Sequence, residues 1–348
     1  MGASLSRRRR DSLGLRANDR LLLLRLPGAV ASPAVRALRV PEPAAVPEPA
    51  DLPEPSPRPG WTLVRVRAAA LNPVDLAIAA GRFYMPVPDP PYIPGAEAAG
   101  EVVGSAAHEP GTPVWCLPMT GALAEMVLVR DENVVPLPPG VGFPLASALG
   151  IAGLAGWMPV RVRGGLSAGE TVVVLGAGGA VGQLAVQAAR DGGSGRIVGV
   201  ARSAGGRDRA VAAGADAALP TGPDLTATLR EACGDGADLV IDTLWGEAAV
   251  AAIGALRRGG RIVQVGSAAG QVAEVVAGPF RGGRLDLRGF SVFSEEPDDI
   301  ARAYRDLAEA AARGAVGMSV VEVPFAQAPA AWARVAAGAG GEKLVVEP

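Results

Sequence analysis

The most informative hydrophobic pattern is an apolar run that leads directly into a cluster of glycines. Val172 to Leu175 are all apolar, and Gly176-Ala177-Gly178-Gly179-Ala180-Val181-Gly182 follow at once. The stretch 183–190 then has the apolar spacing of an amphipathic helix. This order is typical of a dinucleotide-binding site, because glycines let the backbone approach a pyrophosphate and a helix N-terminus attracts anions.

Further along the chain, apolar runs and helical patterns alternate. Strands are predicted at 196–200, 238–244 and 261–266, and a helix is predicted at 247–256. Strands that alternate with helices of about ten residues predict an α/β fold with a parallel, doubly wound sheet. An α/β domain that binds no nucleotide and uses its glycines only for tight turns is the alternative interpretation.

The regions on either side of this pattern contain many short strands. The predicted strands are 61–68, 98–103, 114–117, 123–129, 287–293 and 343–346, and the folded part of the chain is expected to begin at Val35. A short helix is predicted to open at Leu71 to Asp75 and a longer one to span 297–313, whereas 41–59 is predicted to be loop or extended chain. Short strands between Gly- and Pro-rich turns indicate a compact β-rich domain.

These patterns predict two domains and an N-terminal extension. We expect a substrate domain made of residues 35–150 and 290–348, and a dinucleotide-binding domain made of residues 151–289. Residues 1–34 carry seven arginines and two aspartates, a net charge of +5, and show no core-like pattern. We expect them to be disordered or the product of a mis-assigned start codon. Their first residues also match an N-myristoylation signal, and the segment faintly resembles a secretion signal.

The composition restricts the possible chemistry. The 348-residue chain has a net charge of −2, which argues against nucleic-acid binding driven by charge. We expect no membrane span, since the apolar run near the N-terminus is short and interrupted by Arg25 and Pro27. Two cysteines, Cys116 and Cys233, and one histidine, His108, cannot supply a structural four-cysteine zinc site. We expect a buried thiol at Cys116, no disulfide framework, a solvated His108, no metal site and a cytoplasmic, bacterial protein.

Several motifs occur in an order that resembles the medium-chain dehydrogenase/reductase superfamily, in its zinc-free quinone oxidoreductase branch. The motifs are Ala69-Ala70-Leu71-Asn72-Pro73-Val74-Asp75, Pro94-Gly95-Ala96-Glu97-Ala98-Ala99-Gly100, Gly121-Ala122-Leu123-Ala124-Glu125, Ala152-Gly153-Leu154-Ala155-Gly156-Trp157 and Gly341-Glu342-Lys343-Leu344-Val345. The resemblance implies a GroES-like β-rich catalytic domain and a Rossmann domain, with the active site in the cleft between them. We also expect a homodimer.

Two features of the chain separate it from the zinc alcohol dehydrogenases that it otherwise resembles. In those enzymes one zinc ligand is a cysteine near the position of Asn72, and another is a histidine at the position of Ala96. The glycine spacing Gly176-x-x-Gly179-x-x-Gly182 also resembles that of quinone oxidoreductases. Both features imply an enzyme that works without zinc.

The end of the second nucleotide-domain strand predicts the cofactor. An NAD site usually has an acidic residue there, and this chain has Ala201, followed by Arg202 and Ser203. An arginine can bind a 2′-phosphate through two hydrogen bonds, so we expect NADPH. The alternative is that Arg202 is a solvated surface residue. The remaining cofactor contacts are predicted at Gly176, Gly179, Ala180, Val181 and Gly182, and beside the nicotinamide at Val265, Gly266 and Ser267.

The expected reaction is NADPH-dependent reduction of quinones or α,β-unsaturated carbonyls. Asn72 is predicted to donate a hydrogen bond to the substrate oxygen or to the nicotinamide ribose. Tyr84 is predicted to donate a proton, although related enoyl reductases carry their tyrosine one residue earlier, at the position of Phe83. An aromatic side chain that only lines the pocket is the alternative role for Tyr84. A metal-free alcohol or ketone oxidoreductase and a non-catalytic, crystallin-like cofactor-binding protein are the alternative functions.

Overall fold

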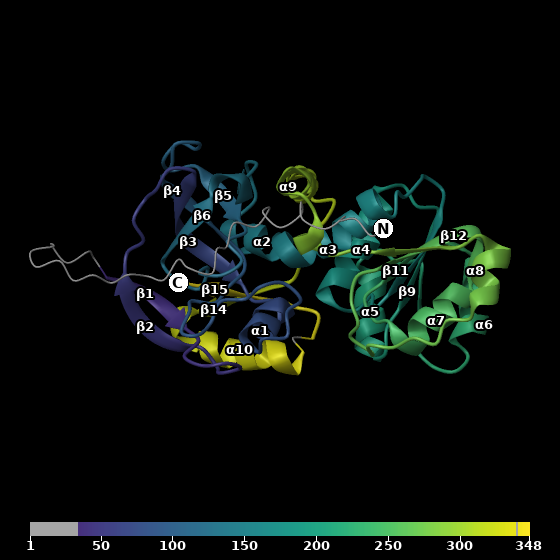
Figure 1. The fold of residues 1–348 in the computed structure, drawn as a ribbon. Helices are drawn as coiled ribbons and strands as arrows, with labels where there is room; N and C mark the ends of the chain where they lie inside the picture. Colours follow the sequence, from purple (N-terminus) through teal and green to yellow (C-terminus); the bar gives the residue numbers. More distant parts are fainter. Residues whose placement is uncertain (1–33, 339) are drawn as a thin grey trace, which may run out of the picture. The chain divides into compact units, whose positions relative to one another are not determined.

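The computed structural model describes residues 34–338 and 340–348, and Ala34–Pro348 form one compact unit (Figure 1). The expectations for the N-terminal extension fall on residues 1–33 and lie outside the described part. Two sheets and a small hairpin make up the fold. The hairpin pairs β1 (Ala34–Arg39) with β2 (Glu48–Pro53).

The first sheet is the β-rich part that the sequence predicts. Its order is β14-β15-β3-β4-β5-β7, with β6 paired to β3, and all its pairs are antiparallel except β14 with β15. The strands are β3 (Trp61–Ala70), β4 (Ala98–Gly104), β5 (Pro113–Cys116), β6 (Met126–Arg130), β7 (Val134–Pro136), β14 (Val320–Pro324) and β15 (Lys343–Glu347). Because β15 pairs with β3, the C-terminal segment returns to the part of the fold formed by the first half of the chain.

The second sheet is parallel and confirms the α/β prediction. Its order is β10-β9-β8-β11-β12-β13, so the direction of winding reverses between β8 and β11, as in dinucleotide-binding sheets. The strands are β8 (Thr171–Leu175), β9 (Arg196–Val200), β10 (Ala217–Leu219), β11 (Ala237–Asp242), β12 (Leu256–Gln264) and β13 (Asp286–Gly289). All five pairings are parallel.

Helices cover both faces of the parallel sheet because its central strands are apolar on both sides. Val172 and Val174 pack into a core with Leu184, whereas Val173 and Leu175 pack with Leu229. This arrangement is the reason why β8 is a continuous apolar run without alternation. The helices of this half are α4 (Ala180–Asp191), α5 (Ala204–Ala212), α6 (Leu225–Cys233), α7 (Gly246–Gly254) and α8 (Ala277–Gly283). A further helix, α9 (Pro297–Ala312), packs instead against β7 and residues 149–158.

A broken helical run joins the two sheets. It consists of α2 (Phe143–Ala148), a wide turn η2 (Leu149–Gly153), α3 (Leu154–Met158) and a second wide turn η3 (Pro159–Arg163). Residues 143–163 are long and apolar enough to cross a membrane by length and composition, but 78% of the most apolar window is buried inside the protein. Burial among other elements explains its apolar character as that of a core helix. The other helical elements are α1 (Pro73–Ala79), η1 (Asp131–Asn133), η4 (Val292–Ser294), η5 (Phe325–Gln327) and α10 (Ala328–Ala337).

Three element predictions need correction. The segment 41–59 contains strand β2, which pairs with β1 along its whole length. The strand predicted at 287–293 ends at Gly289, and Val292 instead turns into the apolar core beside α9. The helix predicted at 247–256 ends at Gly254, so that Leu256 already belongs to β12. The expected domain limits are not tested by these elements and stay a prediction.

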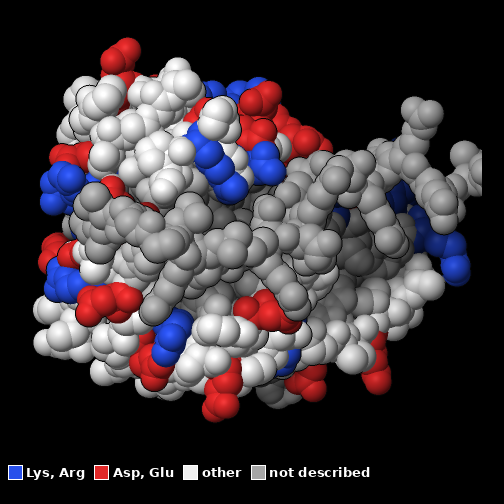
Figure 2. All heavy atoms as spheres, turned by 60° about the vertical axis from the view of Figure 1, so that its left-hand side comes forward, with Lys and Arg blue, Asp and Glu red and all other residues white. Residues whose placement is uncertain are grey.

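The protein carries nearly equal numbers of basic and acidic side chains, which gives the net charge of −2. Figure 2 shows Lys and Arg side chains interspersed with Asp and Glu on the face it presents. Cys116 and Cys233 are buried and free, which confirms the prediction of unpaired thiols.

Candidate cofactor site and active site

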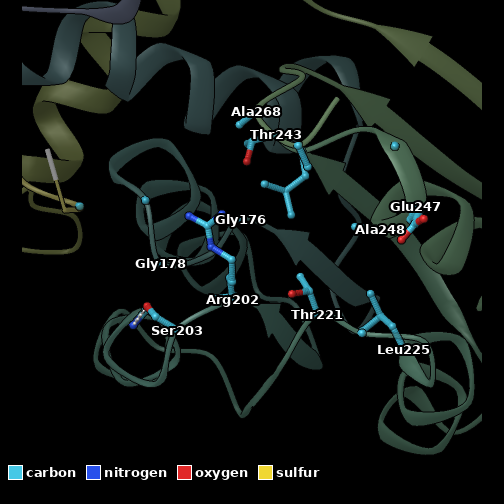
Figure 3. Close-up of a pocket in the computed structure, with 18 of the residues that line it drawn as sticks. Gly176, Gly178, Arg202, Ser203, Thr221, Leu225, Thr243, Glu247, Ala248 and Ala268 are labelled. Carbon is cyan, nitrogen blue, oxygen red and sulfur yellow. Dashed lines mark hydrogen bonds between the residues drawn. The ribbon is translucent and has the colours of Figure 1, made fainter. Parts of the chain in front are cut away.

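A cavity of about 810 Å³ lies at the carboxyl ends of the parallel strands (Figure 3), and we call it the glycine-turn pocket. Its size is that of a typical small-molecule site. The residues that follow β8, β9, β10 and β11 all contribute to it. The lining residues are Gly176, Gly178, Gly179, Ala201, Arg202, Ser203, Gly206, Arg209, Thr221, Gly222, Leu225, Thr243, Leu244, Gly246, Glu247, Ala248, Ala268, Ala269, Val272, Gly340 and Gly341.

The glycine turn is close-packed in a way that only glycine allows. Gly176 has φ +78°, and a Cβ there would lie 2.2 Å from Thr243 Oγ1. A Cβ on Gly182 would lie 2.2 Å from the carbonyl oxygen of Gly176. The turn therefore brings the start of α4 against the end of β8. Gly179 is the N-cap of α4, so the N–H groups of Ala180, Val181 and Gly182 form the first turn of the helix, where an anion is stabilised.

The residues after β9 form the basic end of the pocket. Ala201 is 6% exposed, and Figure 3 shows the Arg202 side chain extending into the pocket. The Ser203 hydroxyl caps α5 by accepting a hydrogen bond from the Gly206 N–H at 3.1 Å. Arg207 is not among the lining residues, and its Nη1 donates to the carbonyl oxygen of Arg202 at 3.2 Å.

Sequence reasoning missed Arg209, which lines the same end. Its Nε donates to the carbonyl oxygen of Gly178 at 3.0 Å, so a second guanidinium lies against the glycine turn. Among the described lining residues the one acidic side chain is that of Glu247, and Figure 3 shows it on the opposite side of the pocket from Ser203. In the sequence, the only indication of Arg209 is its helical spacing from Ser203. Arginine is too common in this chain for that spacing to be informative.

The segment Val265-Gly266-Ser267 follows β12 and lies beside the pocket rather than in its lining. The N–H groups of Val265 and Gly266 donate to the carbonyl oxygen of Asp242 at 2.8 and 3.2 Å. The carboxylate of Asp242 in turn accepts from the N–H groups of Leu244 and Trp245, both at 2.9 Å. Burial raises the pKa of Asp242. This residue, which the sequence did not single out, holds the turns after β11 and β12 together.

A second group of polar residues is buried where α1 meets the first sheet, and we call it the Asn72 network. Asn72, Asp75, Glu97 and Lys343 are each at most 4% exposed. The Asn72 side chain donates from Nδ2 to Glu97 Oε1 at 2.7 Å and to the carbonyl oxygen of Ala70 at 3.2 Å. Its Oδ1 accepts from Lys343 Nζ. The amide orientation is fixed because an ammonium only donates and a carboxylate only accepts.

Glu97 links this network to the broken helical run. Its Oε2 accepts from the N–H of Ile151 at 2.6 Å and from Trp115 Nε1 at 3.2 Å, and Lys343 Nζ lies 3.9 Å from Oε1. Asp75 accepts from the N–H groups of Asn72 and Ala96, at 2.7 and 2.9 Å.

Burial dominates the electrostatics of the network. Desolvation raises the pKa of Asp75 to about 7 and also raises that of Glu97, while it lowers the pKa of Lys343. Both hydrogens of the Asn72 amide are already used, so in this arrangement Asn72 has none left for a substrate oxygen or a ribose. In this arrangement the Asn72 amide holds Glu97 and Lys343 together.

Tyr84 lies apart from that network. The residue is 65% exposed, and its hydroxyl is 2.5 Å from the Ser291 hydroxyl. Among the described residues no hydrogen bond joins Tyr84 to Asn72 or Glu97. No pattern in the sequence indicates Ser291 as a partner, because 207 positions separate it from Tyr84.

No group of three or more His, Cys, Asp or Glu side chains within residues 34–338 and 340–348 is arranged to hold a metal ion. The residues that could hold a dinucleotide are those of the glycine-turn pocket. Its glycine cradle, its helix N-terminus and its two arginines match the pyrophosphate and phosphate groups of such a ligand.

Comparison with known proteins agrees with this geometry. The family described as "Alcohol dehydrogenase GroES-like domain" matches residues 58–139, and the family described as "Zinc-binding dehydrogenase" matches residues 180–309. The "Quinone oxidoreductase" of Mus musculus is 32% identical over 250 residues, which cover 68% of this chain and 75% of the mouse protein.

Two further relatives extend the comparison. The "Spectinabilin polyketide synthase system protein NorB" of Streptomyces orinoci is 32% identical over 294 residues, which cover 83% of this chain but 13% of that protein. The crystal structure of the quinone oxidoreductase from Thermus thermophilus, solved also in complex with NADPH, has a TM-score of 0.77 and 28% identity. The match covers 90% of this chain and 100% of that one.

A parallel dinucleotide-binding sheet joined to a GroES-like β-rich part defines an oxidoreductase that uses a nicotinamide cofactor. The chain belongs to the medium-chain dehydrogenase/reductase superfamily, in its quinone oxidoreductase branch. The resemblance, fold class and enzymatic character expected from the sequence are confirmed.

Proposed function

We propose that this protein is an NADPH-dependent, zinc-independent reductase of quinones or α,β-unsaturated carbonyls. The observation that carries the proposal is the basic end of the glycine-turn pocket, where Ala201 replaces the usual acid and Arg202 and Arg209 line the wall. The experiment that tests it is steady-state turnover with both nicotinamide cofactors and a panel of acceptors.

The preference for NADPH follows from charge. An acid after β9 would bond a ribose 2′-hydroxyl and repel a 2′-phosphate, whereas the methyl group of Ala201 does neither. The guanidinium of Arg202 extends into the pocket and can bind a phosphate through two hydrogen bonds. Arg209 adds a second positive charge close to Gly178.

The other proposed cofactor contacts follow the strand ends. The first turn of α4, with Ala180, Val181 and Gly182, would hold the pyrophosphate against Gly176 and Gly179. Val265, Gly266 and Ser267 would lie beside the nicotinamide, which supplies the hydride when it is bound. Asp242 fixes the backbone of Val265 and Gly266 and so would set the position of that wall.

Independence from zinc is supported by the Asn72 network. Ala96 offers a methyl group, and the Lys343 ammonium is bonded to Asn72 and lies 3.9 Å from Glu97. The Lys343 amino group therefore already occupies the position beside Asn72 and Glu97, and Ala96 offers no metal ligand there. A simple ketone is poorly polarised without a Lewis acid, but a quinone or an enone takes hydride at a conjugated carbon and leaves an oxyanion that hydrogen bonds can stabilise.

Tyr84 is the proposed proton donor. Its phenol is exposed and contacts the segment that follows β13 through the Ser291 hydroxyl. An enone needs a proton at its α-carbon, whereas a reduced quinone can take protons from solvent. Asn72 acts indirectly, because its amide holds Glu97 and Lys343 in place at the start of α1.

Purified protein should be assayed with NADPH and NADH against a 1,4-quinone, an enone, a simple ketone and a simple alcohol. We expect turnover of the quinone and the enone with NADPH, and turnover of the ketone at least about 100-fold slower. Preferred turnover of simple alcohols or ketones would favour the alternative alcohol or ketone oxidoreductase. Cofactor binding with no turnover of any acceptor would favour the non-catalytic alternative.

We further infer that the enzyme works as a homodimer in the bacterial cytoplasm. The homodimer is supported by the edge strand β13, which is paired on one side only among the described strands and carries Leu287 at 47% exposure. Light scattering after gel filtration should give twice the chain mass, and a monomeric mass would contradict this inference.

A further inference from the structure

Tyr84 and Ser291 form a hydroxyl pair that joins two distant segments. The phenol oxygen of Tyr84 and Ser291 Oγ are 2.5 Å apart, and either hydroxyl can donate. Tyr84 lies in the loop after α1, whereas Ser291 follows the last strand of the parallel sheet. The pair therefore connects the segment that follows α1 with the edge of the dinucleotide-binding sheet.

Aromatic packing fixes the two backbones on either side of this contact. The centroid of the Phe83 ring lies 4.6 Å from that of Tyr84 and 5.3 Å from that of Phe293. The contact between Phe83 and Phe293 is edge-to-face. Val292 between Ser291 and Phe293 is 3% exposed and packs into the core. The Ser291 hydroxyl is thus held on a rigid segment, whereas Tyr84 is 65% exposed and is held in part by this hydrogen bond.

The topology places this pair at the edge of the sheet where the reaction is proposed. Strand β13 lies parallel to β12, with Gly289 opposite Gln264, and the N–H of Phe290 donates to the carbonyl oxygen of Gln264 at 2.9 Å. Ser291 therefore emerges at the same edge as Val265, the first residue of the segment proposed to face the nicotinamide. Ligands of open parallel sheets bind at this edge.

We propose that Ser291 is a positioning residue for proton transfer, which donates its hydroxyl hydrogen to the Tyr84 oxygen and so leaves the phenol hydrogen free for the substrate. This proposal rests on the proposed function, since it assigns a role within that reaction. A hydrogen bond from Ser291 stabilises the negative charge that Tyr84 develops as its proton leaves, and hydrogen bonds in series strengthen one another.

With an enone as acceptor, the substrate gains one hydride and one proton. The β-carbon would gain the hydride that leaves C4 of the reduced nicotinamide, the carbon–carbon double bond would be lost, and its electron pair would move to the carbonyl as an enolate. The O–H bond of Tyr84 breaks as its proton goes to the α-carbon, and the tyrosinate, held by Ser291, regains a proton from water. The products are the saturated ketone, the oxidised cofactor and the hydroxide left by the water, so the reaction consumes one proton from solvent.

The test compares Ser291→Ala, Ser291→Thr and Tyr84→Phe, with Ser294→Ala as a control because Ser294 is exposed in the same segment. Each variant is assayed with NADPH against an enone and a 1,4-quinone. We expect Ser291→Ala to lower kcat for the enone by roughly 10-fold or more, with KM for NADPH and quinone turnover within about twofold of the parent. Ser291→Thr should restore most of the enone activity, since it keeps the hydroxyl.

The double variant Tyr84→Phe/Ser291→Ala decides whether the two residues act as a unit. We expect it to be no slower with the enone than Tyr84→Phe alone, because Ser291 acts only through the phenol oxygen. Additive losses, an enone kcat for Ser291→Ala within about twofold of the parent, or an equal loss with quinone and enone would overturn the proposal. Failure of the proposed function is distinct, because the unmodified protein would then turn over neither acceptor.

Discussion

Three arginines follow strand β9 in close succession, and two of them line the glycine-turn pocket. Arg202 extends into the glycine-turn pocket, and Arg209 lines the same end of the pocket from α5. Arg207 bonds back to the backbone of Arg202. Under the proposed function, Arg202 and Arg209 would bind the 2′-phosphate, and Arg207 would hold the loop that carries Arg202.

Replacement of Arg202 tests the cofactor preference. Arg202→Ala should weaken NADPH binding by roughly 10- to 100-fold and leave NADH binding within about twofold, because it removes a charge-assisted contact to the 2′-phosphate only. Fluorescence titration with both cofactors measures the effect, and Arg196→Ala, at the amino end of β9, is the matched control. Equal affinity of the parent protein for NADPH and NADH would contradict the assignment.

Asp75 should make stability depend on pH. Its folded-state pKa of about 7 lies above the ordinary value, so the folded state holds the proton more tightly. The contribution of Asp75 to the free energy of unfolding is therefore complete below about pH 4 and is lost as the pH rises through about 7. It is on the order of a few kcal/mol.

Denaturant titrations of the parent and Asp75→Asn at about pH 4.5, 6 and 7.5 measure this contribution. The free energy of unfolding of the parent should fall relative to that of Asp75→Asn as the pH rises, since asparagine does not titrate. Parallel profiles for the two proteins would show that Asp75 ionises freely in the folded state.

The sequence predicted the site residues that lie next to the predicted strand ends, but not those whose partners are far away along the chain. Gly176, Gly179, Ala201, Arg202 and Ser203 line the glycine-turn pocket because they are neighbours of strand ends that the apolar pattern reveals. The partners of Asn72 and Tyr84 come from positions 271 and 207 residues away, and no local pattern encodes such pairs. For this reason the occupied amide of Asn72 and the contact between Tyr84 and Ser291 could be found only in the structure.

At the scale of elements, the break in the helical run at Gly150 is the best-defined junction. Gly150 has ψ −106° between helical neighbours, and the turn that follows offers the Ile151 N–H to Glu97. α2 packs on the first sheet and α3 packs on α4, so the break lies where the chain passes from one sheet to the other. The position of Glu97 is thereby coupled to the geometry of the junction.

Gly150→Ala should destabilise the protein by about 3 kcal/mol or more. The added Cβ would lie 1.7 Å from Glu97 Oε2 and 2.2 Å from Trp115 Nε1, so the buried carboxylate would have to move away from Ile151. Gly104→Ala is the control, since a Cβ there meets nothing within 4 Å. Equal unfolding midpoints for the two variants would show that the junction can relax around the extra methyl group.

Element prediction succeeded where burial is one-sided or where strands are flanked by glycines, as in β8 and α4. It failed for 143–163, because this helical run is buried on most sides and interrupted by Gly150 and Pro159, which removes the helical period. It also failed for β2, whose proline-rich sequence reads as loop until it pairs with β1.

At the scale of the whole molecule, Lys343 joins the end of the chain to its first helix. β15 pairs with β3, and this brings the one lysine of the sequence to Asn72 and Glu97. The order of the family motifs along the chain predicted the architecture. It did not predict that the C-terminal segment packs against the first half, because this is a tertiary contact that no local pattern encodes.

The resident ammonium leads to a prediction about metal dependence. Purified protein should contain less than about 0.1 zinc per chain, and prolonged treatment with a chelator should leave quinone turnover unchanged, because Lys343 already supplies the positive charge beside Glu97. Elemental analysis and activity before and after dialysis against the chelator give the answer. About one tightly bound zinc per chain, with activity lost on its removal, would refute zinc independence.

The central claim is that the enzyme delivers hydride from NADPH to the conjugated carbon of its substrate. It is tested most directly with NADPH that carries deuterium at the transferred C4 position, an enone, and analysis of the product by NMR and mass spectrometry. We predict one deuterium at the β-carbon of a saturated ketone, with an unlabelled proton from solvent at the α-carbon. Deuterium on the carbonyl carbon of an allylic alcohol, or a product without deuterium, would contradict the account.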